Sequence, residues 1–235
     1  VLLISSISFS TSFAEGNTKT ESGGVSGSVV MNNWGSSEAN FLKIIKKKTS
    51  TEFNNKKSLF HWWLLERIVF PKIGLPTTPV LGYQEYQEKY LLASFSVKRV
   101  GDNDFLTFYK NRLMAYYTKL DAKAYQDYVE KLKSKYGTGS TQNASVYANG
   151  MDYAKRESEY QLTVTNWNQN DSQIFLVKSY VESLGYSFTS VYLLYLNSSM
   201  LNEVANEVSI KVKAEQDKAN AAKERSKKEN LKKID

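Results

Sequence analysis

Few residues of this chain have side chains suited to catalysis or metal binding. Cysteine is absent and His61 is the only histidine, so there is no thiolate site and a Ser/His/Asp arrangement is possible at one place only. His61 stands between Phe60 and Trp62, where a hydrogen-bonded core histidine is more common than a catalytic base. Asp102 and Asp104 lack the glycine and glutamate of a calcium loop, which favours a turn. We therefore expect no catalytic residue, no metal ion and no cofactor.

Paired carboxylates are the one arrangement with catalytic potential. Glu85 and Glu88 lie three residues apart and would share one helix face, which suits general acid–base chemistry. With Asp152 they are the candidates for a hydrolase that acts on a cell-wall or host polymer. Lys89 follows them in a polar stretch, and this context is more typical of a solvated surface. No phosphate-binding loop, dinucleotide fingerprint, zinc motif or nucleophile elbow is present, so a non-catalytic role is preferred and the hydrolase is the alternative.

Positive charge is concentrated in two segments. The net charge is +7; residues 41–72 contribute +6 and residues 211–235 contribute +4, while residues 73–210 contribute −1. Two basic flanks around a balanced centre indicate contact with an anionic surface, polymer or envelope protein, which includes peripheral membrane contact; a solvated face is the alternative. Nucleic acid is not expected in an exported protein. The candidate binding residues are Lys46, Lys47, Lys48, Trp62, Trp63, Trp167, Lys227 and Lys228.

The apolar run Leu59–Phe70 holds two of the four tryptophans. Its length favours a helix over a strand, and Trp62, Trp63 and Leu65 cannot all face one way on either element. The run is therefore expected to be buried on more than one side. An aromatic binding platform is the functional interpretation, and a core segment is the structural one. All three prolines follow within residues 71–79, which predicts a crossover without a helix or a central strand.

These side chains must be positioned by a core that we place in residues 90–196. Phe105–Tyr109 and Leu113–Tyr117 are two runs of strand-forming residues around a short polar break, which predicts a β-hairpin. Asp121 is suited to cap a helix over Ala122–Tyr136, and Gly137 is suited to end it. The apolar stripe of that helix is Tyr125, Tyr128, Val129, Leu132 and Tyr136.

Alternating patterns predict further strands near residues 93–97, 160–165, 174–177 and 188–196. Residues 138–157 are rich in small polar residues and are predicted to form a long loop. About six strands with one helix packed on a face give an α+β fold, an antiparallel meander of type β3-α-β3. A helical segment precedes it, with Ser36 or Ser37 capping a helix that begins at Glu38.

A long basic helix is predicted at the C-terminal end, capped by a residue of Asn197–Ser199. Its apolar stripe stops at Val212, after which only alanine, one leucine and one isoleucine remain among charged residues. Helix-forming residues persist there, so the helix can continue, but with too little apolar face to pack it is expected to project or fray. The apolar stripe consists of Leu201, Val204, Ala205, Val208 and Val212.

Residues 1–14 resemble the apolar core and cleavage end of a signal peptide; a buried strand is the alternative. The domain prediction places a flexible linker in 15–37, one domain in 38–212 and a charged helical tail in 213–235. Within the domain, 38–70 is helical, 71–89 is the proline-rich crossover and 90–196 is the sheet core. We expect a bacterial protein of the periplasm or the exterior that acts as a binding module, and the oligomeric state stays open.

Overall fold

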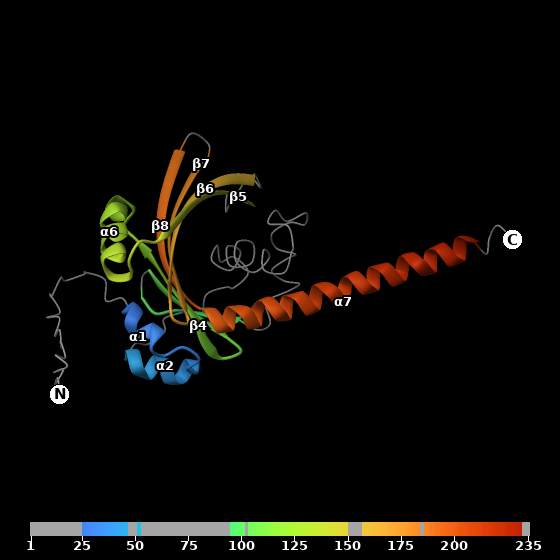
Figure 1. Ribbon diagram of the computed structural model, residues 1–235, viewed down its shortest axis with the longest axis horizontal. Helices are drawn as coiled ribbons and strands as arrows, with labels where there is room; N and C mark the ends of the chain where they lie inside the picture. Colours follow the sequence, from blue (N-terminus) through green and yellow to red (C-terminus); the bar gives the residue numbers. More distant parts are fainter. Residues whose placement is uncertain are drawn as a thin grey trace, which may run out of the picture.

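A computed structural model describes residues 25–46, 51–52, 95–101, 103–149, 157–183 and 186–231. Its centre is one curved antiparallel sheet, with helices packed on both faces (Figure 1). The fold is therefore α+β, as predicted. The strands are β1 (Thr51–Glu52), β2 (Phe95–Arg99), β3 (Asp104–Tyr109), β4 (Arg112–Leu120), β5 (Ser140–Asn149), β6 (Glu157–Gln169), β7 (Ser172–Ser183) and β8 (Tyr186–Asn197). The helices are α1 (Gly27–Met31), α2 (Glu38–Ile45), the 3₁₀ turn η4 (Ala122–Ala124), α6 (Tyr125–Tyr136) and α7 (Ser198–Leu231).

The sheet combines two meanders. Its strand order is β1-β2-β3-β4-β8-β7-β6-β5, so β4 and β8 join the two halves. After β4 the chain crosses to the outer edge at β5 and returns inward through β6 and β7 to β8. Two strands exceed the predicted count of about six: the short β1 and the long β5. The loop predicted over residues 138–157 is wrong for 140–149, which pair with β6 at ten successive positions. Strand β5 escaped prediction because strands are recognised by apolar alternation and most of its residues are small and polar.

The predicted hairpin is β3–β4, and its connection is tighter than the predicted three-residue break. Lys110 and Asn111 have φ values of 50° and 60°, the conformation of a two-residue hairpin turn whose twist matches that of the strands. The register shifts between Thr107 and Phe108, which marks a bulge in β3. The turn brings Tyr109 and Arg112 opposite each other at the end of the hairpin.

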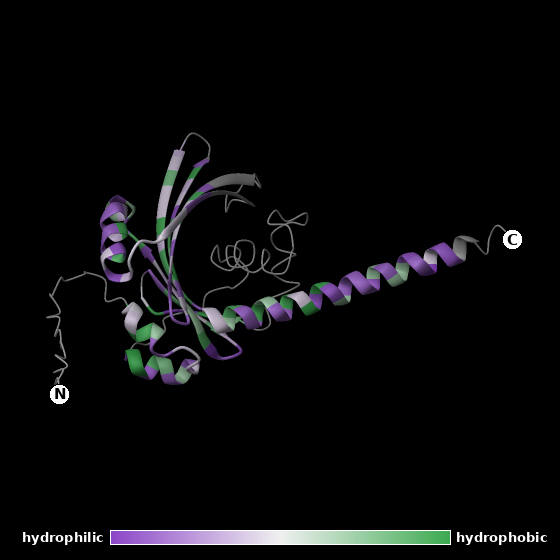
Figure 2. Ribbon diagram, viewed as in Figure 1, coloured by the Kyte–Doolittle hydropathy of each residue, from purple (hydrophilic) through white to green (hydrophobic). Residues whose placement is uncertain are grey.

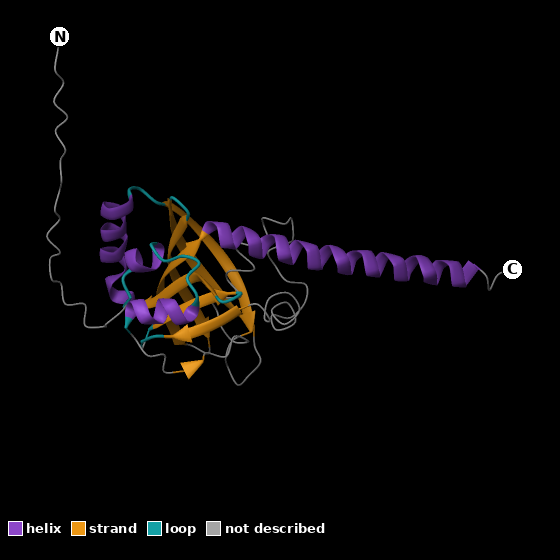
Figure 3. Cartoon of the chain, turned by 90° about the horizontal axis from the view of Figure 1, so that it is seen from below, coloured by secondary structure: helices purple, strands orange, loops and turns teal. Residues whose placement is uncertain are grey.

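Helices α1, α2 and α6 cover the convex face of the sheet, and α7 starts on the other side (Figures 1 and 3). Asp121 accepts a hydrogen bond from the Lys123 amide, but it caps the 3₁₀ turn η4, and α6 begins at Tyr125, three residues after the predicted start. Gly137 ends α6 with φ 83°, as predicted. Leu132 is the buried residue of α6, and the other members of its predicted stripe are partly buried against the same core. Local signals thus specified this helix and its packed face.

The predicted start of α2 is confirmed, since the Ser37 side chain accepts a hydrogen bond from the Asn40 amide. Residues 25–37, the end of the predicted linker, form α1 and a segment that pairs with the hairpin. Val30 of α1 is fully buried, and the Gly35 amide donates to the Leu113 carbonyl oxygen. This part of the predicted linker is folded. The signal-peptide prediction, the Leu59–Phe70 run and the proline-rich crossover lie outside the described residues.

Candidate functional site

The site begins where α7 leaves the sheet. Asn197, the last residue of β8, accepts a hydrogen bond from the Met200 amide at 2.9 Å and caps the helix, within the predicted range. The predicted stripe then packs on the concave face of the sheet: four of its members are buried and Val212 is partly buried. The first turns of α7 are therefore held by the apolar core.

Polar and charged side chains at the end of the β3–β4 hairpin bind the same turns of α7. We call this set the hairpin clamp: Tyr109, Lys110, Arg112, Glu203 and Glu207. The Tyr109 hydroxyl donates to Glu207, and Lys110 Nζ lies 2.8 Å from Glu207 Oε2. Arg112 pairs with Glu203, one helical turn earlier. Because the carboxylates lie four residues apart, both face the hairpin. The clamp fixes α7 relative to the sheet.

The electrostatics of the clamp centre on Glu207. Burial alone would raise the pKa of Glu207, but hydrogen bonds from Lys110, Tyr109 and Lys211 outweigh it and lower that pKa to about 2. Burial, together with the hydrogen bond to Glu207, raises the pKa of the Tyr109 hydroxyl. At neutral pH the Glu207 side chain is thus an ionised carboxylate. It accepts hydrogen bonds from the neutral Tyr109 hydroxyl and from the cationic side chains of Lys110 and Lys211. These interactions hold α7 in place against the hairpin.

Beyond Val212 the helix has little contact with the core. Residues 213–228 are exposed except for the half-buried Glu215, and the helix runs away from the sheet as a straight rod (Figure 1). Figure 2 shows that the strongly apolar residues of α7 lie in its first half. The predicted projection of the tail is therefore confirmed, and the tail remains helical to Leu231.

Charge is unevenly distributed around the projecting helix. With 3.6 residues per turn, one side carries three cations, two alanines and an isoleucine that is 71% exposed. By the same geometry Glu215 and Glu224 project outside this side, and Asp217 lies at its border. We call it the basic face: Ile210, Ala214, Lys218, Ala221, Arg225 and Lys228.

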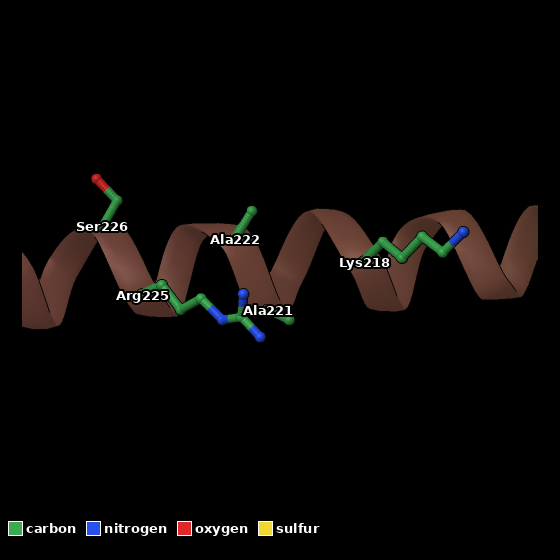
Figure 4. Close-up of a pocket in the computed structure, with 5 residues that line it drawn as sticks. All are labelled: Lys218, Ala221, Ala222, Arg225 and Ser226. Carbon is green, nitrogen blue, oxygen red and sulfur yellow. The ribbon is translucent and has the colours of Figure 1, made fainter.

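Figure 4 shows three residues of the basic face, Lys218, Ala221 and Arg225, together with Ala222 and Ser226. A hollow of about 370 Å³ is lined by residues of this single helix, so it is a shallow surface groove and not an enclosed cavity. In Figure 4 the Arg225 side chain extends along the helix toward Ala221, the Lys218 side chain extends away from it, and Ala222 and Ser226 project to the other side of the ribbon. Such a groove suits an extended anionic surface better than a small molecule. Its lining residues are Lys218, Ala221, Ala222, Arg225 and Ser226.

The predicted binding residues have different positions in the structure. Lys228 lies on the basic face, whereas Lys227 projects outside it and lies 3.8 Å from Glu224. Lys46 is exposed at the end of α2, far from α7 in the chain. Trp167 is buried in the core under α6, and its indole nitrogen donates to the Gly137 carbonyl oxygen at 2.8 Å. The other four, Lys47, Lys48, Trp62 and Trp63, lie outside the described residues.

The clamp and the basic face were both missed in the sequence. The polar break predicted over Lys110 and Arg112 gives no sign of the clamp, and the charge balance of a segment does not distinguish the sides of a helix. The available signals were the four-residue spacing of Glu203 and Glu207 and the seven-residue spacing of Lys218 and Arg225. Only the second of these signals can identify its feature from the sequence, because the hairpin partner is distant along the chain.

A second polar group lies in the core of the convex face. The Tyr116 hydroxyl donates to Asp104 Oδ1 at 2.9 Å, and both side chains are buried. Burial, reinforced by the negative charge of Asp104, strongly raises the pKa of Tyr116, so the hydroxyl stays a neutral donor. Enclosed in this way, the pair satisfies buried polar atoms and offers nothing to a substrate.

The alternative carboxylate residues, Glu85, Glu88 and Asp152, lie outside the described residues. In the part of the chain that the structure describes, no group of three or more His, Asp or Glu side chains is placed to hold a metal ion. None of the described helices combines the length and the apolar composition needed to cross a bilayer. Comparison of the chain with protein-family models, with curated proteins and with solved structures found no match.

Proposed function

We propose that this chain is an exported, non-catalytic binding protein that contacts an extended anionic partner through its basic flanks. The observation that carries this proposal is the basic face of α7, which presents three cations, with one carboxylate, Asp217, at its border, on a helix held away from the sheet. Support for export comes from the apolar character of residues 1–14. Given export, the absence of cysteine favours a bacterial periplasm or exterior.

The shape of α7 favours an extended partner. Residues 213–231 span roughly 28 Å at 1.5 Å per residue, which is longer than a small ligand can engage. The face carries no bulky apolar side chain beyond Ile210, so it is suited to lie on a charged surface and not to insert into one. The hairpin clamp and the buried stripe hold the first turns, so the orientation of this face is set by the folded core.

The test is binding of the full chain to anionic vesicles over a salt series. The variant Lys218→Gln/Arg225→Gln/Lys228→Gln removes the three cations of the basic face. Each cation near an anionic bilayer adds about 1 kcal/mol, so we expect a loss on the order of 100-fold at low salt. The loss should shrink as salt rises, because added ions screen exposed charges.

The matched control is Lys213→Gln/Lys223→Gln/Lys227→Gln, which removes three cations from outside the basic face of the same helix. We expect a clearly smaller loss of binding. Equal losses in both variants would mean that total charge, and not the face, governs binding. If neither variant lost binding to the vesicles, the C-terminal helix would be a solvated helix, and the proposal would be contradicted for the C-terminal flank.

A further inference from the structure

The two edges of the sheet differ in length and in charge. At one end of the strand order lies β1, which has two residues, one of them Glu52. At the other end lies β5, which has ten residues (Figure 1). A long edge strand presents a row of outward N–H and C=O groups that can pair with another strand. Within the described parts of the chain, β5 is therefore the longer unpaired edge of this sheet.

Strand β5 lacks the devices that usually prevent such pairing. It contains no lysine, arginine, aspartate, glutamate or proline over Ser140–Asn149. It pairs with β6 at ten successive positions with no register shift, so no bulge twists the strand away. Among the described residues, no strand pairs with its outer edge.

The side chains of β5 can also form hydrogen bonds across strands. Thr141 and Thr165 share a hydrogen bond of 2.9 Å, and the Thr163 hydroxyl donates to Asn143 Oδ1 at 3.1 Å. Thr141 and Asn143 lie on one face of the strand and are exposed. The same small polar groups can bond to an equivalent strand on the outer side.

We propose that β5 pairs antiparallel with β5 of a second copy of this chain, so that two sheets join into one. An antiparallel pair of identical strands is related by a two-fold axis, the commonest symmetry of soluble dimers. The uncharged sequence suits this occupant, because no like charges meet when the strand faces itself. A charged peptide would find no counter-charge on this edge.

The test is the oligomeric state of the full chain by sedimentation velocity over a concentration series. We expect a reversible monomer–dimer equilibrium for the wild type. Asn143→Lys places a charged side chain on the edge, a device by which natural sheets block pairing, and should raise the dimer dissociation constant at least about ten-fold. The control Gln161→Lys puts the same charge on an exposed position of the inner strand β6 and should change it less than about two-fold.

A wild type that stays monomeric at about 100 µM, well above micromolar dissociation constants, would overturn the proposal, as would a dimer that tolerates Asn143→Lys. If that variant fails to fold, amide hydrogen exchange of the wild type decides. Protection of residues 140–149 that rises with protein concentration supports pairing. Protection that is independent of concentration contradicts it.

Discussion

Neutralising Glu207 should destabilise the protein by about 2 kcal/mol at pH 7. The hairpin clamp lowers the pKa of this carboxyl from 4.5 to about 2. A difference of that size corresponds to at most about 3 kcal/mol of stabilisation of the ionised form. The Glu207 side chain is 25% exposed, and its partners Lys110 and Lys211 are more exposed. Because solvent screens such partly exposed charges, the contribution of the ionised carboxylate is reduced to about 2 kcal/mol. Glu207→Gln keeps the size of the side chain and removes this contribution.

The sign of the pH dependence follows from the direction of the pKa shift. A depressed pKa in the folded state means that the stabilisation is complete above the unfolded value of about 4.5 and is lost as pH falls toward about 2. The difference in stability between wild type and Glu207→Gln should therefore be constant from about pH 6 to 8. It should close steadily below about pH 5, because the wild-type carboxyl becomes protonated.

Chemical denaturation at a series of pH values measures this difference. The matched control is Glu203→Gln, which breaks the ion pair between Glu203 and Arg112 in the same clamp. Both side chains of that pair are nearly half exposed, so the loss of stability should stay below about 1 kcal/mol. Equal losses for both variants would refute the central role of Glu207. A gap that persisted unchanged to pH 2 would show that the variant disturbs packing and not charge.

Two further predictions concern the packed faces of the helices. Leu132→Ala removes the buried residue of α6 and should cost about 2–5 kcal/mol, whereas Lys131→Ala on its exposed side should cost less than about 0.5 kcal/mol in the same denaturation assay. Comparable costs would mean that the packed face is wrongly assigned. Deletion of residues 214–235 should leave the melting temperature almost unchanged, because the buried stripe of α7 ends at Val212. A large drop in thermal melting would show that the tail packs on the core.

Elements defined by near neighbours could be predicted from the sequence. The β3–β4 hairpin, the cap at Asp121 of the turn η4 that leads into α6, and the end of α6 at Gly137 depend on residues a few positions apart. The candidate site was predicted only in part. The projecting helix was expected, but Trp167, proposed for binding, is buried. A tryptophan near a strand end gives no local sign of which face will be covered.

Sequence alone determined where α2 and α7 begin, where α6 ends, where the packing of α7 stops, and where charge accumulates. These properties follow from backbone propensity, apolar periodicity and composition, which act over short distances along the chain. The tertiary structure alone decided that β4 meets β8, that β5 forms an edge, and that Tyr109 reaches Glu207, 98 residues away. Such pairings depend on which surfaces can be buried together, and many distant combinations satisfy the same local pattern.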